Sequence, residues 1–375
     1  LSLREALWLA NLDAGDTQTI TFDVGLDGGT LALDQQLSIT GPVTLDASIL
    51  AGGLTLDAGD GTDDLFGTGD GFRLFTIDDG DNGIHLDVSL IGLTLTGGDV
   101  TGDGGAILSH ESLSLTGVTL SANAATGRGG ALYLNASGTS AVTLESSTIS
   151  GNTSTGAGGG FYASVNDTST LAINFSTVAA NVGATGGGLH LAGTVMPTLD
   201  HTLVAHNEQP GAIADDIYGS VVANWSFIET TTGATITGSD NLTDQDPLLG
   251  ALADNGGPTF THALLPGSPA VNAGDPSFVV PPDFDQRGIA RVQFGRVDIG
   301  AYEFDSVPDT SLLVDLASDG LDGDISATKL SLREALWLAN LDAGDTQTIT
   351  FDVGLDGGTL ALDQQLSITG PVTLD

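Results

Sequence analysis

The sequence predicts an all-β protein, a right-handed parallel β-helix (β-solenoid), and two periodic features support this prediction. An apolar residue, two small or polar residues and an asparagine recur every 26 to 29 residues, ending at Asn123, Asn152, Asn181 and Asn207. Glycine clusters follow the first three asparagines, and each cluster precedes a short apolar stretch. A period in the twenties without helical segments is typical of stacked coils of short strands, ~4.8 Å apart along the axis. Right-handed coils are expected because crossovers between parallel strands are almost always right-handed.

The two recurring residue types have separate expected roles in residues 17–244, the predicted coils. Glycine supplies positive φ at corners where a Cβ would clash. Asparagine tolerates the left-handed conformation, and its amide can hydrogen-bond to the same position in the next coil. We therefore expect the four periodic asparagines to be structural residues.

Residues 1–16 predict a short helix that covers the open end of the coils. Ser2 and Glu5 have the spacing of a capping box, in which each side chain bonds to the backbone of the other residue. Leu3, Ala6 and Leu7 then fall on one face. An uncovered end would expose unpaired strand edges, so a capping helix protects the solenoid from aggregation.

Residues 245–304 predict an irregular C-terminal wrap or cap, because prolines and turn residues concentrate there. Within it, Arg287 is expected to pair with Asp298 or Glu303 and so pin the wrap. Residues 305–329 are expected to be a lead-in with one short strand. Residues 330–375 repeat residues 1–46 without a single difference. This identity predicts a tandem protein whose next unit starts at residue 330.

The motifs at both ends of the unit resemble known families. Ser2-Leu-Arg-Glu-Ala6 resembles the signature of the CSLREA domain, with Leu1 at its Cys position. The segments 255–259, 263–270, 285–288 and 298–303 are similar to the NGGPT, ALLPGSPA, DQRG and DIGAYE signatures of the choice-of-anchor Q domain. The glycine and asparagine pattern resembles the polymorphic outer-membrane protein repeats. The resemblance implies a right-handed parallel β-helix on large exported bacterial proteins, and it transfers no catalytic residue.

The composition excludes several classes of partner. Lys and Arg total 8 and Asp and Glu total 48, which gives a net charge of −40. Nucleic acid is not expected as a partner, since the chain cannot neutralise phosphates. Membrane insertion is not expected either, because no apolar run approaches the ~18 residues that span a bilayer. The chain has no cysteine, so disulfides and thiol chemistry are excluded.

Asp-rich turns are the main candidates for bound ions. The best candidate is a structural Ca²⁺ site at Asp319, Asp322 and Asp324, since closely spaced carboxylates on glycine turns can wrap this ion. The alternative is that Asp favours turns and keeps the surface solvated. No cofactor is expected to be required.

Glycan cleavage is the main enzymatic alternative, because pectinases and many lyases share the β-helix fold. Hydrolysis would need paired carboxylates. Asp215 and Asp216 are adjacent and follow His201 and His206 closely, but we expect them to be solvated turn residues. Basic and aromatic residues for binding sugars are few, so we do not expect an enzyme.

These observations predict a structural repeat unit of a giant secreted bacterial surface protein. Its expected partners are identical neighbouring units that stack head to tail into a filament, stalk or sheath. One alternative is an adhesin that binds environmental or host glycans through its loops. Another is a polysaccharide lyase or hydrolase.

Overall fold

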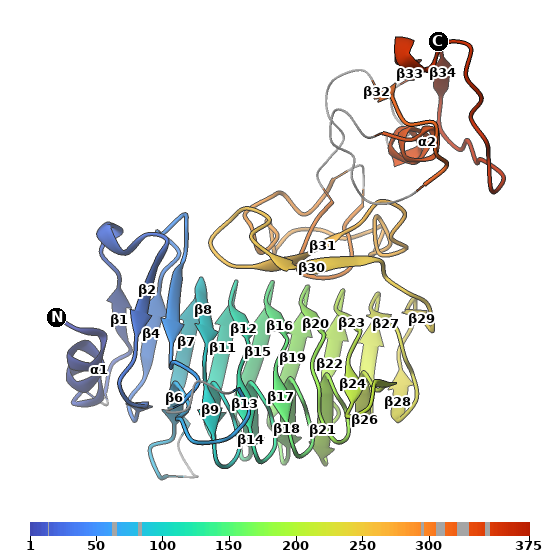
Figure 1. Ribbon diagram of the computed structural model, residues 1–375. Helices are drawn as coiled ribbons and strands as arrows, with labels where there is room; N and C mark the ends of the chain where they lie inside the picture. Colours follow the sequence, from blue (N-terminus) through green and yellow to red (C-terminus); the bar gives the residue numbers. More distant parts are fainter. Residues whose placement is uncertain are drawn as a thin grey trace.

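The chain folds as a parallel β-helix with one short helix at its N-terminus (Figure 1). The computed structural model describes residues 1–13, 15–61, 66–81, 85–293, 296–304, 312–320, 330–341 and 346–375. Successive short strands turn around a common core, and each coil lies against the next in the order of the sequence. The fold class predicted from the periodicity is confirmed.

Two large sheets form the walls of the solenoid within the described residues. The first has nine strands: β2 (Gly29–Ala32), β5 (Leu54–Asp57), β8 (Leu93–Thr96), β12 (Thr119–Ser121), β16 (Thr148–Ser150), β20 (Thr177–Ala179), β23 (Leu203–Ala205), β27 (Phe227–Ile228) and β29 (Leu242–Thr243). The second has fifteen strands in two rows that meet at the long strand β26 (Ile217–Asn224). Its first row contains β1 (Gln18–Thr21), β4 (Val43–Asp46), β7 (Asp87–Ile91), β11 (Ser112–Thr116), β15 (Ala141–Glu145), β19 (Thr170–Asn174) and β22 (Thr198–Asp200). Its second row contains β3 (Leu37–Ile39), β6 (Phe75–Ile77), β10 (Ile107–Ser109), β14 (Leu132–Ala136), β18 (Phe161–Val165) and β21 (Leu189–Gly193), and β28 (Ala234–Thr237) pairs with β26.

Smaller elements complete the described chain. A three-stranded parallel sheet contains β9 (Asp99–Val100), β13 (Ala124–Ala125) and β17 (Thr153–Ser154). Antiparallel pairs are β24 (Glu208–Gln209) with β25 (Ile213–Ala214), and β30 (Leu249–Ala253) with β31 (Thr261–Leu264). The second copy of the repeat contains α2 (Leu332–Leu341), β33 (Gln347–Phe351), β34 (Val372–Leu374) and the 3₁₀ turn η2 (Val353–Leu355). The equivalent 3₁₀ turn of the first copy is η1 (Val24–Leu26).

Apolar side chains stack inside the solenoid because the strands pair in register. Leu115, Leu144 and Ile173 occupy one such row across β11, β15 and β19, and all three are buried. The residues that alternate with these along each strand point outward, as the geometry of a strand requires. Burial of each such side chain contributes about 1.5–3 kcal/mol, so the repeated rows supply the main stabilisation of the fold. The glycine corners are as expected: Gly129 has φ +67°, and an added Cβ would lie 2.2 Å from the carbonyl oxygen of Leu132.

Helix α1 (Leu3–Asn11) begins at the predicted capping box. Ser2 Oγ accepts from Glu5 N, and the Glu5 carboxylate accepts from Ser2 N at 2.8 Å. Leu7 and Ala10 are the buried residues of the helix. The helix contacts β1 and β3, so it lies at the N-terminal end of the solenoid (Figure 1).

The segment 245–304, expected as a wrap or cap, folds back along the side of the solenoid (Figure 1). Its contacts reach from the turn at Gly53, next to the carbonyl of Pro258, to His201, whose carbonyl accepts from Gly300 N. The described contacts of this segment lie on the flank of the coils, so we call it the wrap. The flank holds the segment because it carries a row of hydrogen-bonding side chains.

The second copy begins beside the wrap and forms a small core of its own. Strand β32 (Leu312–Val314) pairs in parallel with β33, and β33 pairs with β34. Phe304, at the end of the wrap, and Leu338 of α2 belong to the same buried cluster. Residues 305–311 and 321–329 of the lead-in lie outside the described residues.

Candidate functional site

The four periodic asparagines form one continuous ladder of buried side chains. Asn123, Asn152, Asn181 and Asn207 are each at most 1% exposed. The backbone N–H and the side-chain amide of each donate to Oδ1 of the next, at 2.9–3.1 Å between the first three. Each Nδ2 also donates to a backbone carbonyl in the preceding coil, as Asn152 Nδ2 does to Leu120 O at 2.9 Å. The amides thus tie consecutive coils together at a position where the chain turns.

Asp216 ends this ladder, and its neighbour Asp215 is also buried. Asp216 Oδ1 accepts from the N–H and the amide of Asn207, and its Oδ2 accepts from Thr230 N at 2.7 Å. Burial raises the pKa of Asp216 to about 7. Asp215 accepts from Gly186 N at 2.7 Å. The expectation that both carboxylates are solvated is therefore wrong. Both are buried because they accept hydrogen bonds from N–H groups that would otherwise lack an acceptor.

A row of threonines on the flank holds the wrap. Thr119, Thr148 and Thr177 occupy equivalent outward positions on β12, β16 and β20. Thr119 Oγ1 donates to Phe260 O at 2.7 Å, Thr148 Oγ1 donates to Gln286 Oε1 at 2.6 Å, and Thr177 Oγ1 accepts from Ala301 N at 3.0 Å. The wrap is thus hydrogen-bonded to three consecutive coils through the equivalent threonine of each coil.

A buried ion pair joins the wrap to the corners of the coils. Arg291 and Glu303 have fully buried side chains, with Nη1 and Oε1 3.0 Å apart. Arg291 Nη2 donates to Ser146 Oγ at 2.9 Å and to the carbonyl of Phe175 at 3.3 Å. Burial lowers the pKa of Arg291 and raises that of Glu303, while the attraction between the two charges opposes both shifts. Removing either partner would leave a buried charge without compensation.

The predicted partners of Arg287 differ from those in the structure. Arg287 pairs with Asp285 at 2.8 Å, and its Nη2 donates to the backbone carbonyl of Glu303. Asp298 instead accepts from the backbone N–H groups of Asn272 and Phe304, and burial raises its pKa to about 7. The motif residues do pin the wrap, but Arg291 supplies the charge that was assigned to Arg287.

The candidate Ca²⁺ site is only partly described. Asp322 and Asp324 lie outside the described residues. Asp319 forms an ion pair with Arg333 of the second copy and accepts from Asp363 N at 2.7 Å. Its carboxylate is thus used within the protein, where it holds the lead-in against the second copy.

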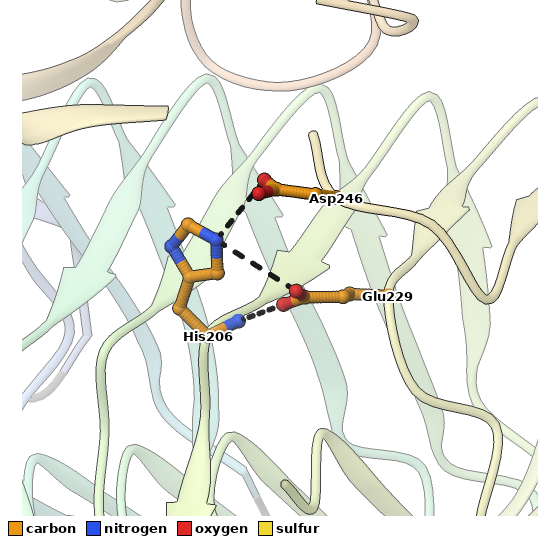
Figure 2. Close-up of side chains that lie close together, drawn as sticks. All are labelled: His206, Glu229 and Asp246. Carbon is orange, nitrogen blue, oxygen red and sulfur yellow. Dashed lines mark hydrogen bonds and ion pairs between the residues drawn. The ribbon is translucent and has the colours of Figure 1, made fainter. Parts of the chain in front are cut away.

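One exposed group of side chains has a spacing that suits a metal ion. His206 Nε2 lies 3.4 Å from Asp246 Oδ1 and 3.8 Å from Glu229 Oε1, and Figure 2 shows the imidazole facing both carboxylates. Tetrahedral zinc with bonds of about 2.1 Å needs ligand atoms about 3.4 Å apart. Glu229 also accepts from the backbone N–H of His206 at 2.6 Å, so a surface cluster without a metal ion accounts equally well for the geometry. Asp78, Asp79 and Glu111 form another acidic group of this kind.

A row of stacked rings follows the axis on another face. The ring centroids of Tyr133 and Tyr162 are 5.3 Å apart, and the two ring planes are nearly parallel, with an interplanar angle of 3°. His190 and Tyr218 continue the stack at 5.1 Å and 4.8 Å. Arg128 lies 4.7 Å above the ring of Tyr162. Inside the row the rings cover one another's faces and leave their edges outward, whereas Tyr218 at the end of the row is 47% exposed.

The sequence analysis did not identify the threonine row or Arg291 as structural residues. The threonine row has a visible signal, since Thr119, Thr148 and Thr177 each precede the apolar residue of the periodic motif. Arg291 has no comparable signal, because its partners Ser146 and Phe175 are more than a hundred residues away.

Comparison with known proteins finds no family model, no curated protein and no solved structure that matches this chain. The likeness of its terminal motifs to the CSLREA and choice-of-anchor Q signatures remains an interpretation. In the described part of the chain, no helix combines the length and the apolar character that crossing a membrane requires.

Proposed function

We propose that this chain is a structural repeat unit of a giant secreted bacterial surface protein, with units joined head to tail in a filament, stalk or sheath. The observation that supports this proposal is the junction between the two copies. There the end of one wrap and the helix of the next copy share a buried apolar cluster.

The junction has the character of a packed interface. The rings of Phe304 and Trp337 meet edge to face with their centroids 4.7 Å apart. Val271 of the wrap packs against the same cluster. Such aromatic pairs contribute about 0.5–1.5 kcal/mol beyond the burial of their area. A contact of this kind favours a fixed joint over a flexible linker.

The charge and the surface chemistry also favour a structural role. A net charge of −40 makes neighbouring filaments repel one another and keeps a long assembly dispersed. The buried carboxylates Asp215 and Asp216 serve the coils, which gives the polysaccharide lyase or hydrolase alternative little support. In the ring stack Tyr162 and His190 have both faces covered by neighbouring rings, which gives the adhesin alternative little support on that face.

Electron microscopy of a protein with four tandem units tests the proposal. We expect the same angle between neighbouring units at every joint, because each joint buries the same side chains. A matched protein with Phe304→Ser and Trp337→Ser at each joint should lose this regularity while its solenoids stay intact. Units that adopt random angles in the unmodified protein would refute the structural role and would shift attention to glycan binding.

A further inference from the structure

The two identical copies have different surroundings in this chain. Leu9 of the first copy is 46% exposed, whereas its equivalent Leu338 is fully buried. Ile20 is half-buried, whereas its equivalent Ile349 is fully buried. The same amino acids therefore form an open apolar surface in one copy and a closed core in the other.

Strand β32 of the lead-in closes this surface in the second copy. It pairs in parallel with β33, with Leu312 opposite Ile349 and Val314 opposite Phe351. Leu312 and Val314 are at most 3% exposed, whereas Leu313 between them is 38% exposed. This alternation is that of a strand with one face on a core.

Polar contacts fix the position of the residues after β32. Asp315 Oδ1 accepts from Leu330 N at 2.7 Å. The carboxylate of Asp319 accepts from Arg333 Nε at 2.9 Å and from Asp363 N at 2.7 Å. Ser331 Oγ donates to the carbonyl of Gly320 at 2.6 Å. The segment 312–320 is thus held by its strand at one end and by the contacts of Asp319 and Gly320 at the other.

The first copy has the same groups without such a segment. Among the described residues β1 pairs with β4 alone, so its other edge is open. Beside it lies a groove of about 970 Å³, lined by Leu9, Ile20 and Phe22 among others. Arg4 donates to the carbonyls of Gln35 and Gln36, as Arg333 does to the equivalent pair, but it contacts no carboxylate in the described structure.

We infer that the groove over α1 and β1 is a docking site for the segment 312–320 of another copy of the unit. The segment adds a strand to the open edge of β1, with Leu312 opposite Ile20 and Val314 opposite Phe22. Its Asp319 pairs with Arg4. This inference rests on the proposed head-to-tail function and specifies the joint: each unit supplies the strand that completes the next one.

The second copy identifies the occupant. An open β-edge pairs with any strand of suitable pattern, and the pattern that fits this edge is already seen on an identical surface. In a tandem protein the segment stays tethered close to its groove, and a short tether gives effective concentrations of about millimolar. Docking then needs little intrinsic affinity.

A cysteine reporter tests the inference, because the chain has no natural cysteine. In the 375-residue chain, Leu9→Cys should react rapidly with a thiol reagent, and the matched Leu338→Cys at least about tenfold more slowly, since labelling there requires local opening. A chain with an additional copy of residues 304–329 ahead of Leu1 should slow labelling at position 9 to the rate at position 338.

The control chain carries Leu312→Asp and Val314→Asp in the added segment only, and it should restore rapid labelling at position 9. Labelling that stays rapid with the unmodified segment overturns the inference, and so does equal protection by both segments. This outcome is independent of the microscopy: a regular filament with a reactive position 9 would keep the structural function and reject this joint. Protection of position 9 without a regular filament would support this joint and reject the structural function.

Discussion

Replacement of Asn152 by alanine is the most direct test of the ladder that joins the coils. The side chain makes five hydrogen bonds within the described structure. Its Oδ1 accepts from the N–H and the amide of Asn123. Its Nδ2 donates to Leu120 O, Ser150 O and Asn181 Oδ1, at 2.9–3.1 Å. Asn152→Ala removes all five.

The cost follows from the groups that are left without partners. Asn123 Nδ2 keeps two other acceptors, Leu95 O and Ser121 O, so it remains satisfied. The backbone N–H of Asn123 is buried and loses its acceptor, which costs about 1–3 kcal/mol. The small cavity and the weakened bonding of the Leu120 carbonyl add to this. We therefore expect a loss of about 2–4 kcal/mol in the free energy of unfolding.

Urea-induced unfolding followed by circular dichroism measures this loss. The matched control is Asn174→Ala, which removes the same amide from an outward, half-buried position on β19. That change should alter the free energy by less than about 0.5 kcal/mol. Equal midpoints for the two variants would refute the ladder as a source of stability. Hydrogen exchange at Asn123 N–H should accelerate in Asn152→Ala even if the coils unfold in separate steps.

Three further changes test the buried charges and the wrap. Between about pH 4 and 7 the free energy of unfolding should fall by up to about 4 kcal/mol, because burial raises the folded-state pKa of Asp216 to about 7 while the unfolded chain already ionises this group above pH 4. Asp216→Asn should reduce the pH dependence of the melting temperature without abolishing it, because burial also raises the pKa of Asp298 to about 7; an unchanged curve would contradict this assignment. Arg291→Met should cost about 3–5 kcal/mol and expose the wrap to limited proteolysis, since it leaves Glu303 buried and unpaired; adding Glu303→Gln should recover part of the loss, and a double variant no more stable than the single one would argue against the pair. Gly53→Ala should loosen the wrap measurably more than Gly59→Ala in the same proteolysis assay, because an added Cβ at Gly53 would meet a wrap carbonyl at 1.6 Å whereas none of the described atoms lies within 4 Å at Gly59; equal digestion rates would place the wrap elsewhere.

The sequence predicted the coils well because their determinants repeat. The asparagine motif, the glycine corners and the capping box of Ser2 and Glu5 are local patterns, and local patterns survive without knowledge of the fold. The same holds for the short strand expected in the lead-in at Leu312 to Leu316, which the structure has as β32 (Leu312–Val314).

The wrap was harder to predict because its contacts are long-range. Nothing in the spacing of Arg287 and Arg291 indicates which of them meets Glu303, since the choice depends on where the segment lies against Ser146 and Phe175. Likewise, the sequence could not indicate that Asp319 pairs with Arg333, because that contact exists only after the lead-in has docked.

The asparagine ladder has a direction and an end. Each side-chain amide donates to Oδ1 of the asparagine in the following coil and accepts through its own Oδ1 from the preceding one, so the side-chain dipoles add along the axis and place positive charge density at their last member, Asn207. Asp216 meets that end with a carboxylate, which can accept the last N–H but has none to donate while it is ionised. A carboxylate in place of the amide therefore ends the ladder. Whole coils can be gained or lost between Asn123 and Asn207 with both ends unchanged, so the length of such a unit can evolve in steps of one coil.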